Sequence, residues 1–218
     1  MRTAGLLLAA GGSRRLGTPK QLLPGVDELP LVTRAAQQLL TVGCAPVVVV
    51  LGAEAEAVGA AVGALPVQCV INADWERGMG GSIAVGITAL EAGGSDRVAA
   101  DAVLIAACDM PSVTESHLTA LLTAAAEGRR VASAYTRDDG TLVRGVPAVL
   151  PHTDWPWLRT LTEDQGARDL LRHADTRAVL LPDGALDLDT VADLARWRAT
   201  GAAWQLAPHA PLPDPRPS

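Results

Sequence analysis

Short apolar runs alternate along the chain with segments of helical or alanine-rich spacing. The apolar runs have the length of strands buried on both faces, and they lie at residues 6–10, 47–51, 67–71, 102–107 and 130–135. The segments between them predict helices at residues 31–40, 54–64, 82–91 and 114–127, the last with Thr114 as its N-cap. This alternation predicts an α/β fold in which helices cover both faces of a mostly parallel sheet.

A glycine-rich loop follows the first predicted strand. Its three glycines permit positive φ angles and a close approach of the backbone to a ligand, and successive N–H groups in such a loop form a concavity that holds anions. Arg14, Arg15 and Lys20, the one lysine of the chain, add positive charge. Because ligands of parallel sheets bind beyond the carboxyl ends of the strands, this loop is a candidate phosphate-binding site.

Two familiar phosphate loops do not fit this segment. The Walker A pattern requires a lysine where this chain has Thr18, and the lysine comes two residues later, behind Pro19. The spacing of Gly11, Gly12 and Gly17 also differs from the G-x-G-x-x-G fingerprint of dinucleotide-binding proteins. The loop is therefore predicted to be a phosphate binder of a third kind.

Residues 8–20, LAAGGSRRLGTPK, resemble the signature L-A-A-G-x-S-x-R-x-G-x-P-K of nucleotidyltransferases similar to molybdenum cofactor cytidylyltransferase, within the nucleoside triphosphate transferase superfamily. The resemblance implies a Rossmann-like three-layer sandwich of the nucleotide-diphospho-sugar transferase type. It also implies that the loop binds the nucleotide through Ala9, Ala10, Gly11, Gly12, Ser13, Arg15 and Lys20. Arg15 and Lys20 are the candidate catalytic cations, which would balance the charge on departing pyrophosphate.

Asp109 follows the apolar run that ends at Cys108, at the same predicted sheet edge as the glycine-rich loop. A carboxylate there can hold a magnesium ion that bridges triphosphate oxygens. Taken alone, an aspartate two residues ahead of Pro111 is more typical of a turn or an N-cap. The family carries C-D-Q-P or C-D-M-P at this position, and the resemblance implies that Asp109 binds Mg²⁺ and belongs to the catalytic and nucleotide site.

The segment 71–87 resembles the family pattern N-x-x-W-x-x-G-M-x-x-S, which implies contact with the nucleoside. Asn72, Gly78 and Ser82 are the candidate nucleotide-binding residues: Asn72 offers a donor and an acceptor, Gly78 permits close approach, and Ser82 is expected to start a helix whose positive end faces phosphate. The alternative is a flexible turn in which Trp75 packs as a plug.

Two later segments resemble the family's acceptor side. Gly145 and Pro147 match its G-x-P strand segment, and Arg168 matches the arginine of its G-D-x-G-A-R stretch, in which Glu163 replaces the first glycine. By resemblance these three residues bind the acceptor, with Arg168 as a clamp for its phosphate. Alternatively, Arg168 opens a helix and pairs only with Asp164 or Glu163.

The segment 186–194, LDLDTVADL, resembles the family's D-I-D-T-P-E-D-L. Asp187 and Asp189 are spaced i and i+2, so in an extended segment they point the same way and could complete a magnesium site opposite Asp109. Either Asp189 or Thr190 is also a plausible N-cap for the helix that follows. The sequence does not choose between Asp187 and Asp189 as the metal ligand.

Composition limits the classes of partner. The 218 residues, 49% apolar, predict one compact domain at 1–206 followed by a proline-rich disordered tail at 207–218. A net charge of -6 argues against nucleic-acid and anionic-membrane partners. The first apolar run is too short for a signal or membrane segment, and three widely spaced cysteines suit a reducing compartment, so we expect a cytoplasmic protein. The four histidines show no metal-ligand spacing.

These observations predict a Mg²⁺-dependent nucleotidyltransferase, because a site rich in Gly, Arg, Lys and Asp suits the positioning and charge neutralisation that such transfer needs. The resemblance implies transfer of CMP from CTP to the phosphate of molybdopterin, with release of pyrophosphate and with a molybdoenzyme or its maturation chaperone as a protein partner. One alternative is GTP or another nucleoside triphosphate with a sugar phosphate or another phosphorylated metabolite as acceptor. Another is a non-catalytic carrier of the molybdenum cofactor.

Overall fold

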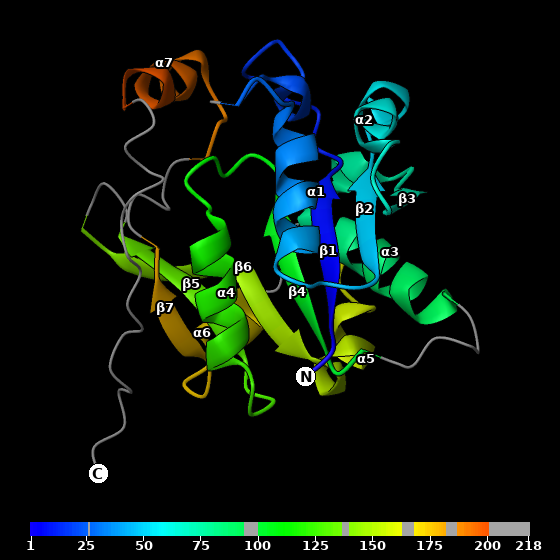
Figure 1. The fold of residues 1–218 in the computed structure, drawn as a ribbon, viewed down its shortest axis with the longest axis vertical. Helices are drawn as coiled ribbons and strands as arrows, with labels where there is room; N and C mark the ends of the chain where they lie inside the picture. Colours follow the sequence, from blue (N-terminus) through cyan, green and yellow to red (C-terminus); the bar gives the residue numbers. More distant parts are fainter. Residues whose placement is uncertain (26, 94–99, 137–139, 163–167, 182–186, 201–218) are drawn as a thin grey trace.

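A computed structural model describes residues 1–218 except 26, 94–99, 137–139, 163–167, 182–186 and 201–218 (Figure 1). The described residues form a seven-stranded sheet in the order β3-β2-β1-β4-β6-β5-β7. Its strands are β1 (Thr3–Ala9), β2 (Val47–Leu51), β3 (Gln68–Ile71), β4 (Ala102–Ala107), β5 (Val131–Thr136), β6 (Leu142–Pro151) and β7 (Arg177–Leu180). All neighbours are parallel except that β6 runs antiparallel to both β4 and β5, so the prediction of a mostly parallel α/β sheet is confirmed.

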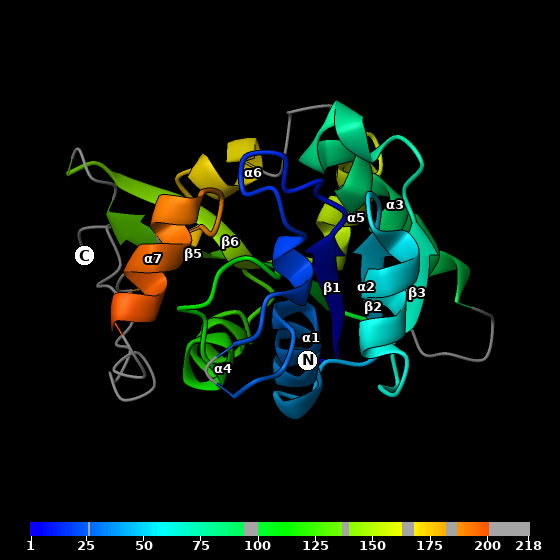
Figure 2. The same ribbon diagram turned by 90° about the horizontal axis from the view of Figure 1, so that it is seen from above.

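Helices cover both faces of the sheet, which gives the predicted three layers. Figure 2 shows α1 (Leu31–Thr41), α2 (Ala55–Val62) and α4 (Glu115–Ala124) on one face and α3 (Met79–Ala92), α5 (Trp155–Leu158) and α6 (Arg168–Arg172) on the other. The last described helix, α7 (Val191–Thr200), lies beyond the carboxyl ends of the central strands (Figure 1). None of the described helices is both long and apolar enough to cross a membrane.

The central strands are buried because each supplies apolar side chains to two cores. In β1, Leu7 packs into the cluster under α1, α2 and α4, whereas Leu6 and Leu8 pack into the cluster under α3 and α5. Alternate residues of a strand point to opposite faces, so a continuous apolar run is what a strand between two helical layers requires. The carboxyl end of β1 therefore emerges from between two packed helical layers, which positions the start of the glycine-rich loop.

Several predicted boundaries agree with the structure, and three are wrong by three residues: the start of β1, which is Thr3 and not residue 6, the end of α4, which is Ala124 and not residue 127, and the start of α3. The strands at 47–51 and 102–107 have the predicted limits, and Thr114 caps α4 by accepting a hydrogen bond from the N–H of His117. Helix α3 begins at Met79 and not at Ser82, because Gly78 with φ 122° is its N-cap and Gly80 and Gly81, which precede the predicted helix at 82–91, are helical. Burial of Ile83 and Ile87 outweighs the low helix propensity of glycine there. The predicted tail at 207–218 lies outside the described residues.

Candidate functional site

The loop after β1 is held in shape by Ser13. This residue has a φ of 48°, and its carbonyl oxygen accepts hydrogen bonds from the N–H groups of Leu16 and Gly17, both at 3.0 Å. Its hydroxyl accepts a hydrogen bond from the backbone N–H of Lys20 at 3.0 Å. The loop therefore closes on itself and fixes the residue at which the 3-10 helix η1 (Lys20–Leu22) begins.

An aromatic ring joins this loop to the second glycine-rich segment. A Cβ atom on Gly12 would lie 2.6 Å from the ring of Trp75, so only glycine permits the ring to pack there. The guanidinium carbon of Arg14 lies 5.6 Å from the centroid of the same ring, and Arg14 also forms an ion pair with Glu76. Trp75, in the 3-10 helix η2 (Trp75–Arg77), thus packs against the phosphate loop.

The ammonium group of Lys20 lies between two carboxylates from distant parts of the chain. Its Nζ is 2.5 Å from Oδ2 of Asp109 and 2.8 Å from Oδ1 of Asp189, and Arg15 contacts the other oxygen of Asp189 at 2.7 Å. Lys20 and Asp109 are largely withdrawn from solvent, with 13% and 19% of their side chains exposed. Burial alone lowers the pKa of Lys20, but the two carboxylates outweigh it and raise that pKa well above its ordinary value.

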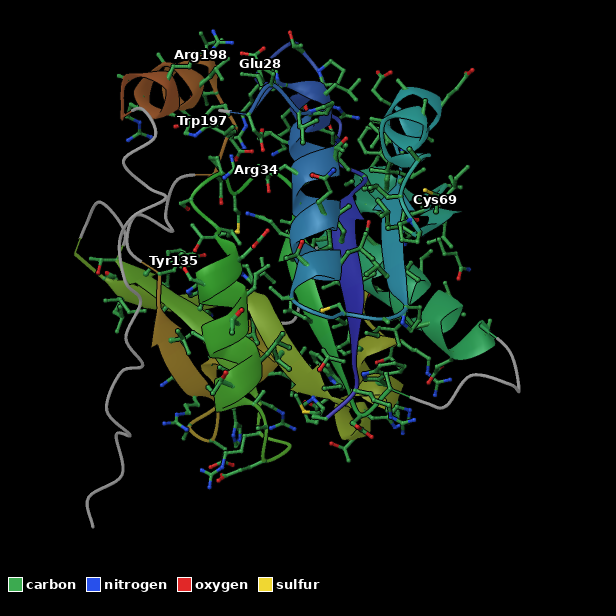
Figure 3. All side chains as sticks on the ribbon, in the orientation of Figure 1. Glu28, Arg34, Cys69, Tyr135, Trp197 and Arg198 are labelled. Atoms are coloured by element: carbon green, nitrogen blue, oxygen red, sulfur yellow. The ribbon has the colours of Figure 1, made fainter. Side chains whose placement is uncertain are left out.

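A backbone contact brings the segment that precedes α7 to the end of β4. The N–H of Leu188 donates to the carbonyl oxygen of Asp109 at 3.1 Å. The Leu188 side chain is fully buried in a small cluster with residues of the phosphate loop, of the segment after η1, of α1 and of α7, which are Leu16, Leu23, Leu31 and Trp197. Figure 3 shows Trp197 between α7 and the segment that leads into α1. This cluster explains how residues far apart in sequence meet at one edge of the sheet.

The carboxylates at this edge of the sheet are suitable ligands for a hard divalent cation. Asp187 is exposed, yet desolvation, followed by the charges of Asp109 and Asp189, raises its pKa to about 7. Carboxylate oxygens are the ligands that magnesium and manganese prefer. Among the described residues, however, no three acidic, histidine or cysteine side chains are arranged as a metal site, and the ammonium group of Lys20 lies between Asp109 and Asp189. A metal ion would have to displace that ammonium group.

A cavity of about 320 Å³ opens beside this cluster. Eight of the predicted nucleotide-binding residues line it: Ala9, Ala10, Gly11, Gly12, Lys20, Gly78, Ser82 and Asp109. Three other candidates, Ser13, Arg15 and Asn72, are not among the described residues of its wall. Asn72 is buried behind the wall, where its amide donates to the hydroxyl of Ser82 at 3.0 Å and its carbonyl accepts from the N–H of Asp74.

The family is decided by comparison with known proteins. The family described as "MobA-like NTP transferase domain" matches residues 5–179 of the chain. The chain belongs to the MobA-like NTP transferase domain family. It is a nucleotidyltransferase, as the resemblance of its first loop implies.

Individual relatives cover nearly the whole chain. "Nicotine blue oxidoreductase" of Paenarthrobacter nicotinovorans is 36% identical over 200 residues, which cover 88% of this chain and 94% of that protein. "Purine catabolism protein PucB" of Bacillus subtilis (strain 168) is 32% identical over 203 residues, 86% of this chain and 90% of that protein. The crystal structure of Rv0371c from Mycobacterium tuberculosis H37Rv superposes with a TM-score of 0.73 at 29% identity over 90% of this chain and 97% of that one. A structure of Rv0371c in complex with manganese has a TM-score of 0.68 at 26% identity over 90% and 98%.

The predicted acceptor residues of this nucleotidyltransferase lie apart from the cavity wall. Gly145 is in β6 opposite Ser133, and a Cβ atom on it would lie 2.7 Å from the hydroxyl of Tyr135. Pro147 follows two residues later in the same strand. Arg168 begins α6, and residues 163–167, which precede it in the predicted acceptor segment, lie outside the described residues. The structure therefore does not bring Gly145, Pro147 and Arg168 together with the loop in one described cavity.

Sequence reasoning missed Gln21. This residue is only 1% exposed, and its side-chain amide donates to the carbonyl oxygens of Ala9 and Gly11 at 3.0 and 2.6 Å. The one signal for it was a polar residue between the loop lysine and the apolar Leu22–Leu23 pair, a pattern too common to single it out. The pairing of Arg14 with Glu76 was missed as well, because contacts between exposed charges far apart in sequence leave no periodic pattern.

Proposed function

We propose that this nucleotidyltransferase transfers CMP from CTP to the phosphate of molybdopterin. In the reaction, a phosphate oxygen of the acceptor forms a bond to the α-phosphorus of CTP while the bond from that phosphorus to the bridging oxygen of the β-phosphate breaks, and pyrophosphate leaves. The observation that supports the proposal most strongly is the convergence of Lys20, Asp109 and Asp189 beside a glycine-lined cavity. A triphosphate and its counterions need such an arrangement of positive charge and carboxylate.

In the proposed mechanism, the loop and its cations hold the triphosphate. The backbone N–H groups of Gly11, Gly12 and Ser13 lie where the loop turns, and none of them donates a hydrogen bond to another described residue. Successive free N–H groups bind anionic oxygens. Arg15 and Lys20 would then exchange their contacts with Asp189 and Asp109 for contacts with phosphate oxygens, so that positive charge stabilises the departing pyrophosphate.

A divalent cation, proposed to be Mg²⁺, would supply charge neutralisation on the phosphate oxygens when bound. Asp109 together with Asp189 or Asp187 would hold it, because these are the carboxylates that the structure gathers at the end of β4. Support for a divalent cation comes from the related Rv0371c, whose structure was solved in complex with manganese.

The preference for CTP is proposed from the sequence of the loop, and the position of the acceptor is proposed from the direction of β6. Ala9, Ala10 and Gly11 followed by Pro19 and Lys20 resemble the cytidylyltransferase form of the loop, whereas guanylyltransferase relatives tend towards A-G-G and D-K. Because β6 is antiparallel to β4 and pairs its residue 148 with residue 105, the earlier β6 positions 145 and 147 lie towards the carboxyl edge of β4. We therefore place the acceptor on that side, with Arg168 as a phosphate ligand.

We further propose that the reaction takes place in the cytoplasm and delivers its product to a molybdoenzyme or to a maturation chaperone. The three cysteines are free thiols, as expected in a reducing compartment.

Pyrophosphate release measured with each nucleotide tests this proposal. The purified protein is incubated with Mg²⁺, with CTP or GTP, and with or without Mo-molybdopterin, and the nucleotidylated product is identified by mass spectrometry. We expect release with CTP that depends on both Mg²⁺ and molybdopterin. Faster release with GTP, or with a sugar phosphate as acceptor, would contradict the choice of substrates, and tight molybdopterin binding without turnover would indicate a carrier.

A redox activity is the second candidate, because a relative that is 36% identical carries the name of an oxidoreductase. Loss of nicotine blue absorbance in the presence of a reduced nicotinamide dinucleotide would measure it. Under our proposal this absorbance stays constant with the wild-type protein. A turnover that persists in Lys20→Met would favour the redox activity over nucleotidyl transfer.

A further inference from the structure

His117 and Ser133 form a buried polar pair that the proposed mechanism does not use. His117 lies in α4 and Ser133 in β5, and both are 0% exposed. The Ser133 hydroxyl donates to the carbonyl oxygen of Pro147 in β6 at 2.6 Å, and Nε2 of His117 lies 2.8 Å from the same hydroxyl oxygen. A serine hydroxyl has one hydrogen and a carbonyl oxygen can only accept, so the His117 ring donates its Nε2–H to Ser133.

The carbonyl group of Pro147 belongs to a bulge in β6. The register of β5 and β6 shifts between Ala132 and Ser133, whose partners are Ala148 and Gly145, so two residues of β6 fall between the two pairs. Proline has no N–H for a strand ladder, and such a bulge is one of the places in a sheet that tolerate it. A bulged carbonyl oxygen in the core needs a donor from outside the ladder, and the serine hydroxyl, held by the imidazole, supplies it.

The bulge lies at the level where β6 leaves β4. The ladder between these strands ends at the pair Ile105–Ala148, whereas β4 continues to Ala107 and is followed by Asp109. Figure 1 shows the beginning of β6 running away from the carboxyl end of β4, towards β5. Bulges interrupt strand pairing, bend the strand that carries them and are common beside active sites. The bulge therefore sets where the beginning of β6 lies relative to the carboxylates of the proposed site.

We infer that His117 and Ser133 are positioning residues for the phosphorylated acceptor, and this inference rests on the proposed function. The acceptor is proposed to lie against β6, at Gly145 and Pro147. The hydrogen bonds from His117 through Ser133 to Pro147 fix the backbone of that segment from within the core. The His117 bond also ties it to α4, the helix that follows the Asp109 loop. An acceptor oxygen must approach phosphorus in line, and a misplacement of about 1 Å can lower the rate about 100-fold.

Loss of this chain of hydrogen bonds should affect the acceptor and not the nucleotide. The described wall of the cavity beside the glycine-rich loop contains no residue of β5 or β6. The KM for CTP should therefore stay constant while the KM for the acceptor rises. A merely structural role would lower the amount of folded protein, which changes neither KM value.

The experiment measures pyrophosphate release with CTP, Mg²⁺ and Mo-molybdopterin, and it determines the KM for each substrate separately. Ser133→Ala removes the hydroxyl, His117→Leu removes the donor to it, and His117→Gln keeps a side-chain N–H donor. Thr33→Val is the matched control, because Thr33 in α1 also donates a hydroxyl to a backbone carbonyl, that of Ala61 at 2.9 Å.

We expect the KM for the acceptor to rise roughly tenfold or more in Ser133→Ala and His117→Leu and to stay within about threefold of wild type in His117→Gln. The KM for CTP should stay within about twofold of wild type in all three, and Thr33→Val should leave both values unchanged.

An unchanged KM for the acceptor in Ser133→Ala, or equal increases in the two KM values, would overturn the inference and leave the proposed function intact. No pyrophosphate release by the wild-type protein with any phosphorylated acceptor would overturn both. Should release require an acceptor other than Mo-molybdopterin, the two KM values are compared with that acceptor and decide the inference in the same way. Should His117→Leu fail to fold, Ser133→Ala, which removes a single oxygen atom, decides.

Discussion

Replacement of Lys20 by Met tests the role of the one ammonium group in the site. The variant keeps an unbranched side chain and removes a charge that lies 2.5 and 2.8 Å from two carboxylates. Removal of one positioned group that stabilises transition-state charge typically lowers kcat by about 100- to 1000-fold, or about 3–4 kcal/mol. Because no other lysine exists in the chain and Arg15 is largely exposed, we expect a decrease at least that large.

The same substitution should cost less in stability than in catalysis. Loss of one partner from a fully buried ion pair costs about 3–5 kcal/mol. Asp109 and Asp189 keep 19% and 35% of their side-chain exposure, so water and Arg15 offset part of this, and we expect a decrease of about 1–3 kcal/mol in the free energy of unfolding. Since Lys20 has a raised pKa, it remains charged across neutral pH. Because its charge also lowers the pKa of Asp187, which is about 7, the decrease in the free energy of unfolding should be larger at pH 9 than at pH 6.

Two measurements check these figures. Pyrophosphate release gives kcat, and urea unfolding followed by circular dichroism gives the stability. Arg129→Met is the control, because it removes an exposed cation that pairs with Glu127 outside the site and should leave both values unchanged. A kcat of Lys20→Met within fivefold of the wild-type value, with the fold intact, would refute the reasoning.

Three further substitutions probe the surroundings of the site. Gly12→Ala should displace the indole ring packed on it and lower the free energy of unfolding by about 1–3 kcal/mol, while Gly11→Ala, with nothing within 4 Å of its added Cβ, should change thermal stability little. Asp187→Asn removes a carboxylate that desolvation and neighbouring charges hold at a pKa of about 7, so the folded state binds its proton more tightly than the unfolded state does. In urea unfolding the variant should be more stable than wild type at pH 8, and this gain should shrink as the pH falls from 7 towards 4. An equal gain at pH 4 and pH 8 would contradict the raised pKa. Leu188→Ala should cost about 2–5 kcal/mol in urea unfolding, against almost none for the exposed Val191→Ala, and equal losses would show that the Leu188 cluster does not anchor the segment.

The fold could be predicted at the strands that are buried on both faces, because such burial restricts their residues to apolar ones. The apolar runs of β2 and β4 allow one assignment, so their limits agree with the structure. The predicted start of α3 was wrong, because glycines at positions 80 and 81 are typical of a loop and only the packing of the helix against the sheet makes them helical. The reversed direction of β6 was not predicted either, since strand direction depends on long-range pairing that a local pattern does not contain.

The proximity of Lys20 and Asp109 follows from topology, because loops after parallel strands meet at one edge of the sheet. The sequence did not indicate that Lys20 itself would bridge Asp109 and Asp189, since the free energy of three partly buried charges depends on their mutual distances. Nor did it indicate Gln21, whose partners are backbone carbonyls, which any sequence provides. The roles of the individual site residues remain predictions of the proposed function.

A crystal structure with Mg²⁺ and a non-hydrolysable CTP analogue tests the central claim most directly. We predict that the triphosphate lies in the cavity beside the glycine-rich loop, with Lys20 Nζ moved from Asp109 to a phosphate oxygen and the metal ion on Asp109 and one of the two later aspartates. A structure in which Lys20 keeps both carboxylates while the nucleotide binds elsewhere would contradict the account.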